Sequence, residues 1–166
     1  MTVEVAKAAR SDALQVCEVL RRSILEVCGP DYTQIDGFVE NWLDNKTPET
    51  IAKWIEAPET YFVVARVSTE ERIAGVGCVS RHGEILLCYA VPEYIGKGIG
   101  RAMLASLEQQ AKNWGNTEFT VLSTVTARTF YARQGYVETG LPVKEHGIEI
   151  EILMVKNNVL SPIRTP

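Results

Sequence analysis

Glycine occupies every second position in the segment 96–101, where it alternates with a lysine, an isoleucine and an arginine. An apolar run that stops at Pro92 precedes the segment, and apolar residues at helical spacing follow it. A glycine loop that opens a helix directs backbone N–H groups and the positive end of the helix dipole to one point, where phosphate binds. Glycine also lets the backbone approach a diphosphate closely. We therefore predict a diphosphate site formed by Gly96, Lys97, Gly98, Ile99, Gly100 and Arg101.

Two common phosphate-binding loops do not fit these residues. A dinucleotide-binding G-x-G-x-x-G loop requires glycine or alanine where Arg101 or Met103 stands, and it would follow the first strand of the chain. A P-loop requires serine or threonine directly after its lysine, and Gly98 stands there. A glycine-rich connector that binds no ligand is the remaining alternative.

The elements that would position this loop follow from the spacing of apolar residues. Alternating or continuous apolar runs predict strands at residues 3–8, 61–67, 73–79, 84–91, 118–122 and 148–155. Apolar residues three and four apart predict helices at residues 13–27, 38–42, 48–55, 99–114 and 127–134. Ser11 and Asp12 are expected to cap the first helix, and Gly29 with Pro30 to end it. We expect one domain over residues 1–157 and a C-terminal tail over residues 158–166.

Composition narrows the classes of partner. The chain has 166 residues and a formal net charge of −4, which argues against a nucleic-acid partner because such proteins carry a basic face. Four cysteines without a C-x-x-C pair predict neither a metal site nor disulfides. The sequence shows no signal peptide and no apolar stretch of about 18 residues, so we expect no membrane association and a cytoplasmic location.

Two ordered motifs carry a family resemblance. Residues 90–104, which include the glycine loop, resemble the acyl-CoA signature of the GNAT superfamily of N-acetyltransferases. Residues 127–136 resemble the later A-x-x-F-Y-x-x-x-G-F motif, in the form found in bacterial members that acetylate small molecules. The sequence departs from the pattern at Ile95, where the signature has glutamine or arginine, and at Thr124, where many members have asparagine.

The resemblance implies an α/β GNAT fold: a mixed, mostly antiparallel, twisted sheet of about seven strands with helices on both faces. Its two central strands would splay apart, and the pantetheine arm of acetyl-CoA would enter between them. Beyond the glycine loop, the resemblance implies that acetyl-CoA is bound by Cys88, Tyr89, Ala90, Val91, Thr124 and Tyr131. No metal is implied.

The resemblance also implies direct transfer of the acetyl group to the primary amine of a small molecule through a tetrahedral intermediate. Tyr131 matches the residue that protonates the departing thiolate in many members, and Glu84 matches the base of the histone-acetylating members. A core tyrosine and a solvated carboxylate are the alternatives, and His82 is a rival base. The backbone N–H of Cys88 or Tyr89 would stabilise the oxyanion, while the Cys88 thiol fits simple packing better than a covalent relay.

Several other properties stay open. The chain could acetylate protein lysines or N-termini, or it could bind acyl-CoA as a regulatory module without turnover. Tyr32, Trp42 and Trp54 are candidates for the wall of the acceptor pocket, although aromatic residues at helical spacing usually belong to the core. Residues 148–155 form a candidate homodimer interface, and their alternating glutamates fit plain solvent exposure equally well.

Overall fold

A computed structural model describes residues 1–68 and 70–158. Eight strands form one sheet, with the bounds β1 Val3–Lys7, β2 Thr60–Val67, β3 Ile73–Ser80, β4 Glu84–Ala90, β5 Glu118–Thr124, β6 Val137–Glu138, β7 Val143–Glu145 and β8 Ile148–Asn157. The α-helices are α1 Ala13–Ser23, α2 Phe38–Leu43, α3 Pro48–Glu56, α4 Ile99–Asn113 and α5 Arg128–Arg133. Short turns of other helix types are η1 Arg10–Asp12, η2 Ile24–Cys28, η3 Gly29–Tyr32 and η4 Pro92–Tyr94. The expected tail begins at residue 158, and residues 159–166 lie outside the described part.

The sheet confirms the expected mixed topology. Its strands run in the order β1-β2-β3-β4-β5-β8-β6, with β7 paired to β8, and β4 with β5 is the parallel pair. Eight strands replace the expected seven or so, because β6 and β7 contribute only two and three residues each. Segments that short show no apolar period, so the sequence did not reveal them.

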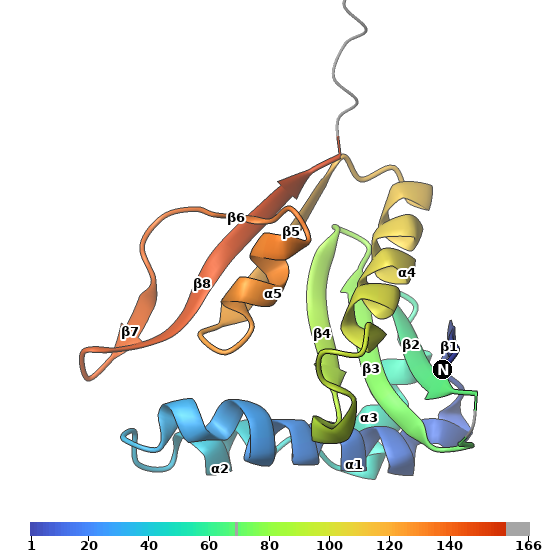
Figure 1. Cartoon of the computed structure of the whole chain (residues 1–166), viewed down its shortest axis with the longest axis horizontal. Helices are drawn as coiled ribbons and strands as arrows, with labels where there is room; N and C mark the ends of the chain where they lie inside the picture. The colour runs from blue at the N-terminus through green and yellow to red at the C-terminus, as the bar shows by residue number, and fades with distance from the viewer. Residues whose placement is uncertain (69, 159–166) are drawn as a thin grey trace, which may run out of the picture.

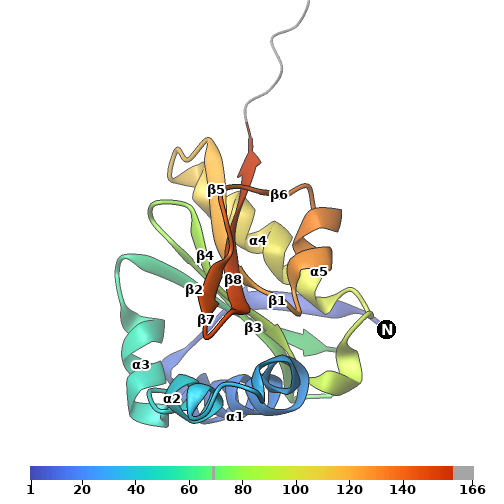
Figure 2. The same ribbon diagram turned by 90° about the vertical axis from the view of Figure 1, so that its left-hand side faces the viewer.

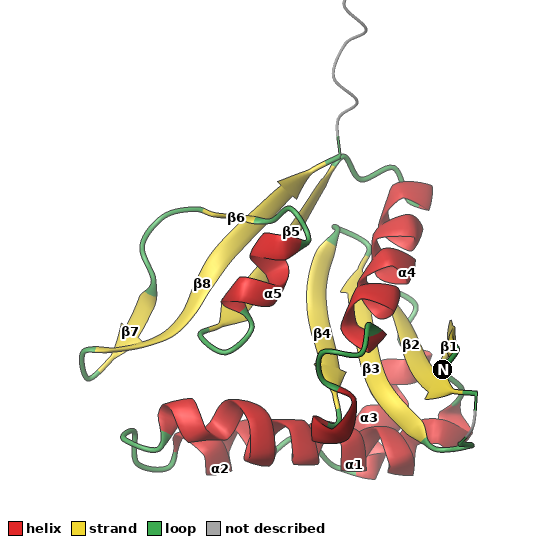
Figure 3. Ribbon diagram, in the orientation of Figure 1, coloured by secondary structure: helices red, strands yellow, loops and turns green. Residues whose placement is uncertain are grey.

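Helices cover both faces of the sheet, as expected (Figures 1 and 3). Helices α4 and α5 lie on one face, and α1, α2 and α3 lie at the other side of the molecule (Figure 2). Glycines on β3 allow α4 to pack closely: a Cβ atom at Gly75 would stand 2.8 Å from side-chain atoms of both Ile99 and Met103. The start of α4, and with it the glycine loop, is therefore held against the central strands.

One local prediction was wrong. Asp12 does not cap α1; its carboxylate accepts the Ala9 N–H at 2.9 Å and pairs with Arg66 at 2.7 Å. The first helix also changes character after Ser23, where it continues as the π-type turn η2 before Gly29. Thr47, by contrast, accepts the Thr50 N–H at the start of α3. Within residues 1–68 and 70–158, no helix is long and apolar enough to cross a membrane.

Candidate active site

The parallel strands β4 and β5 separate soon after they meet. They pair at Glu84 with Thr120 and at Ile85 with Val121, and their register ends there. Figure 1 shows the two strands diverging toward the end of the molecule where α1 and α2 lie. The remaining length of β4 therefore has a free edge on the β5 side.

On the free edge of β4, the backbone N–H and C=O groups of two residues have no partner strand. The Val91 N–H donates to the Ala74 carbonyl at 2.9 Å, so residues of β4 at even spacing from Val91, such as Tyr89, bond to β3. Cys88 and Ala90 consequently direct their N–H and C=O groups away from β3, toward the separated β5. An extended ligand could pair with this edge as an additional strand would.

The glycine loop follows directly and has the geometry of an anion site. Gly96 and Gly98 adopt φ values of +78° and +86°, a region that disfavours other residues, and a Cβ atom on either would meet nothing within 4 Å. The first helical bond runs from the Ala102 N–H to the Gly98 carbonyl at 3.0 Å. The preceding N–H groups have no helical partner, and they belong to Ile99, Gly100 and Arg101.

The free strand edge and the glycine loop open into one cleft with a volume of about 440 Å³. Its lining includes most of the residues predicted to bind the cofactor: Cys88, Tyr89, Ala90, Gly96, Gly98, Gly100, Arg101, Thr124 and Tyr131. The structure thus brings together the two sequence motifs, which lie 30 residues apart between Gly98 and Arg128.

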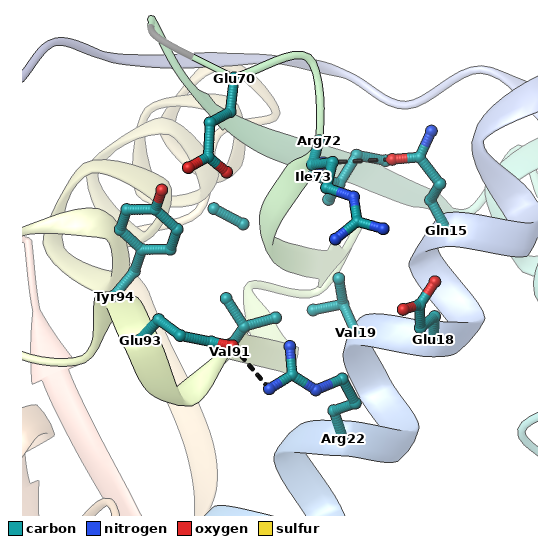
Figure 4. Close-up of a pocket in the computed structure, with 11 residues that line it drawn as sticks. Gln15, Glu18, Val19, Arg22, Glu70, Arg72, Ile73, Val91, Glu93 and Tyr94 are labelled. Carbon is teal, nitrogen blue, oxygen red and sulfur yellow. Dashed lines mark hydrogen bonds and ion pairs between the residues drawn. The ribbon is translucent and has the colours of Figure 1, made fainter.

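Three of the predicted cofactor-binding side chains lie outside the cleft lining. Ile99 is fully buried in the core, and Lys97 lies with its ammonium 5.3 Å from the centre of the Tyr94 ring. Val91 lines a separate, polar pocket between α1, the start of β3 and η4 (Figure 4). In that pocket Arg22 pairs with Glu93 at 2.8 Å, so part of the positive charge of Arg22 is already neutralised.

The ring of Tyr131 belongs to an aromatic cluster beside the cleft. It is buried and packs edge-on against Phe130 and Tyr136, at centroid distances of 5.0 and 5.5 Å. Every fully buried side-chain oxygen and nitrogen among the described residues has a hydrogen-bond partner. Tyr131 is one of the residues that line the cleft. Burial, followed by the neighbouring Cys88 and Tyr89, raises the pKa of Tyr131 well above its usual value. The phenol therefore stays protonated and can act as a proton donor.

The cleft thiols are not activated nucleophiles. Burial, reinforced by the charge of Glu108, raises the pKa of Cys88 to about 12. Burial likewise raises the pKa of Cys28 to about 11, with Asp31 as the second cause. Because the thiolate is the reactive form, neither residue is prepared for covalent catalysis.

Glu84 and His82 lie at the closed end of the splayed strands. Glu84 is half-buried, begins β4 and is not among the residues that line the cleft, and His82 is exposed in the preceding turn. The structure therefore does not bring Glu84 into contact with the lining around Tyr131. The early aromatic residues form a packed cluster, with Tyr32 4.8 Å from Phe38 and 5.9 Å from Trp42 between ring centroids.

Sequence patterns missed several lining residues that come from α1 and its extension. Ser23, Val27 and Cys28 close the cleft from that side, and the Ser23 hydroxyl donates to the Ala90 carbonyl at 2.7 Å. A serine and two small apolar residues at helical spacing do not indicate a functional site from the sequence alone. Only the approach of the end of α1 to β4 gives them a place in the site.

Comparison with known proteins agrees with this geometry. The family model described as an acetyltransferase (GNAT) domain matches residues 28–156, which is well over half of the chain. The chain belongs to the GNAT acetyltransferase family. Acyl transfer is accordingly the chemistry that this GNAT domain supports. A search among curated proteins finds no significant match.

Solved structures of other GNAT proteins share the fold at low sequence identity. A GCN5-related N-acetyltransferase from Rhodopseudomonas palustris has a TM-score of 0.81 at 21% identity, over 95% of this chain and 96% of that one. PaiA N-acetyltransferase from Thermoplasma acidophilum, solved with coenzyme A, has a TM-score of 0.77 at 21% identity, over 95% and 99%. An aminoglycoside 6'-acetyltransferase type Ii has a TM-score of 0.72 at 16% identity, over 96% and 99%.

Proposed function

We propose that this chain transfers the acetyl group of acetyl-CoA to the primary amine of a small molecule, directly and through a tetrahedral intermediate. The observation that carries the proposal is the meeting of the glycine loop, the free edge of β4 and Tyr131 in one cleft. A PaiA structure of the same fold contains coenzyme A, which supports a coenzyme A thioester as co-substrate.

The described residues fit acetyl-CoA. The open space at Gly96 and Gly98 and the free N–H groups of the first turn of α4 would hold the pyrophosphate. The N–H and C=O groups of Ala90 and the C=O group of Cys88 would pair with the amides of the pantetheine arm. Acetyl-CoA would supply an activated acetyl thioester. The described residues contain no cluster of three potential metal ligands, and the proposal needs none.

Each chemical task then falls to a group of this chain. The Cys88 N–H, on the free edge of β4, would stabilise the developing oxyanion. The Tyr131 hydroxyl would donate a proton to the departing sulfur. Glu84 does not line the cleft and would therefore take the amine proton through water. The raised pKa of Cys88 favours direct transfer over an acetylated cysteine.

A small acceptor fits the enclosure of the cleft better than a protein does. The Tyr32 hydroxyl donates to the Ile150 carbonyl at 2.6 Å and accepts the Val125 N–H at 3.1 Å, so η3 is tied to the strands beyond the cleft. The Asp31 carboxylate accepts the Thr126 hydroxyl beside it. These contacts would hinder an extended peptide at that end of the cleft. Four free thiols accord with a cytoplasmic location.

Calorimetric titration with acetyl-CoA tests the proposal. Gly98→Asp places a carboxylate where the pyrophosphate would lie and should abolish binding, because like charges repel at the helix N-terminus. Gly37→Asp is the matched control, since Gly37 is also a left-handed N-cap, with φ +73° and no atom within 4 Å of its Cβ position. Absence of binding to the wild type would refute the proposal. Binding without turnover of any amine would favour a regulatory acyl-CoA-binding module, and turnover of peptides alone a protein acetyltransferase.

A further inference from the structure

Within the described residues, no helix covers the face of β5 and β8 that points away from α5. Figure 2 shows α4 and α5 on one side of these strands and α1, α2 and α3 beyond one end of them. On the α5 side, Phe119, Val121 and Met154 are buried. The alternate residues must point to the uncovered face, because successive side chains of a strand point to opposite sides.

Three leucines on this uncovered face form a continuous apolar stripe. Leu122 of β5 lies directly opposite Leu153 of β8 in the antiparallel register. Leu86 follows Ile85, the last residue of β4 that pairs with β5. It has no partner in the register with β3, and this β-bulge turns its side chain outward on the same face. The exposed fractions of Leu86, Leu122 and Leu153 are 44%, 47% and 39%. We call these residues the leucine stripe.

The leucine stripe is continuous with the proposed active site. Leu86 and Leu122 both belong to the lining of the cleft that holds Cys88 and Tyr131. An acceptor must reach the thioester from the side that the cofactor does not occupy. The leucine stripe would form the floor of that approach, because contiguous exposed apolar surface on a folded protein can mark a binding site.

The charged side chains that β4, β5 and β8 place on this face are all acidic. On the same face of these three strands, alternation places four carboxylates and no lysine or arginine at the described positions. They belong to Glu84, Glu118, Glu149 and Glu151, of which Glu149 is already paired with Arg128 at 2.8 Å. An ammonium group would be drawn to this face. A second ammonium resting on the leucines themselves would lose hydration without gaining a partner.

We propose that the acceptor is an amphiphilic primary amine, with one positive charge and an apolar alkyl or aryl body that lies on Leu86, Leu122 and Leu153. This inference rests on the proposed acetyl transfer and specifies its substrate class. The apolar body buries the leucine stripe, and the amine end reaches the cleft near Tyr131.

A series of unbranched alkylamines tests the substrate class, because their ammonium pKa values are nearly equal and only the apolar length changes. We expect kcat/KM to rise at least about tenfold from ethylamine to hexylamine, since each buried methylene is worth about fourfold. Leu122→Ser and Leu153→Ser should each reduce that ratio to about threefold or less. Leu122→Met should retain it, because it conserves volume and apolarity.

The controls separate this inference from the proposed function. Leu14→Ser removes a leucine of α1 that is more exposed, at 69%, and should leave the length preference unchanged. Acetyl-CoA titration of Leu153→Ser and Leu14→Ser, which change residues outside the cleft lining, should match the wild type, which shows that the fold and the cofactor site are intact. Titration of hexylamine into the complex with coenzyme A should show tighter binding than ethylamine in the wild type and not in Leu122→Ser.

Specific results would overturn the acceptor class. They are a flat or falling dependence on chain length, a preference for 1,4-diaminobutane over hexylamine, and no turnover of any alkylamine by a protein that binds acetyl-CoA. A wild-type dimer that Leu153→Ser converts to a monomer, without any length preference, would assign the stripe to a second copy of the chain instead. Loss of acetyl-CoA binding itself would refute the proposed function, and with it this inference.

Discussion

The hydroxyl of Ser23, at the end of α1, donates a 2.7 Å hydrogen bond to the carbonyl oxygen of Ala90 on the free edge of β4. This carbonyl points toward β5, where the sheet has opened and offers it no strand partner. Ser23 is itself 1% exposed, so the bond links the helical layer to the wall of the cleft. It satisfies one lone pair of the carbonyl and leaves the second for a ligand.

Ser23→Ala should therefore loosen the end of β4. We expect a loss of about 1 kcal/mol in the free energy of unfolding and a rise in the KM for acetyl-CoA with little change in kcat. Ser80→Ala is the control: Ser80 accepts the Glu84 N–H at 3.3 Å at the closed end of the strands. It should lower stability without changing the KM, and equal KM changes in both variants would contradict the role given to Ser23.

Tyr131→Phe should lower kcat by about 100-fold with little change in acetyl-CoA affinity, because it removes a proton donor and keeps the packed ring. Burial raises the pKa of Tyr131, so the phenol remains protonated as pH rises through its usual value. We therefore expect no descending limb from Tyr131 below about pH 10 in the wild-type profile. Tyr61→Phe, on β2, serves as control, and an unchanged kcat in Tyr131→Phe would remove Tyr131 from the mechanism.

Glu84→Gln should reduce kcat/KM most at low pH, where the acceptor amine is protonated and needs a base. The difference from the wild type should shrink as pH approaches the pKa of the amine, since less of the amine then requires deprotonation. His82→Gln should leave the pH profile unchanged, because His82 is exposed in the turn before β4. A pH-independent effect of Glu84→Gln would indicate a structural role only.

Cys88→Ala should retain kcat to within about tenfold, whereas a covalent relay would lose nearly all activity. In the wild type, the Cys88 thiol should react slowly with iodoacetamide near neutral pH, because burial raises its pKa to about 12 and little thiolate is present. Acetyl-CoA should slow the reaction further by covering the free edge of β4. Direct transfer would be contradicted by two results together. Iodoacetamide would rapidly abolish the activity of the wild type but not that of Cys88→Ala, and an acetylated cysteine would accumulate during turnover.

Glu108→Ala should lower the free energy of unfolding by about 3 kcal/mol, because it leaves two buried or half-buried partners unsatisfied. Glu108 on α4 is 8% exposed, accepts the Tyr136 hydroxyl at 2.9 Å and pairs with Lys156 at 3.1 Å. Gln109→Ala on the exposed side of the same helix should change stability by less than about 0.5 kcal/mol. Chemical denaturation measures both, and similar values would show that the buried pair adds no net stability.

The sequence by itself determined the loop and the order of the main elements. Glycines at positions 96, 98 and 100 before a helical stripe specify an anion site locally, because φ values and free N–H groups of a first helical turn depend on neighbouring residues alone. The continuous apolar run of β4 likewise identified a central strand. Elements as short as β6 and β7 carry no such period and were not predicted.

Only the tertiary structure decided which side chains share the cleft. The sequence assigned Val91 to the cofactor with its neighbours, whereas the alternation of β4 against β3 directs it to the pocket beside α1. Ser23 and Cys28 entered the site because the end of α1 approaches the free edge of β4, and Leu122 and Leu153 became neighbours through strand pairing. These relationships depend on contacts between residues far apart in the chain, which local spacing does not encode.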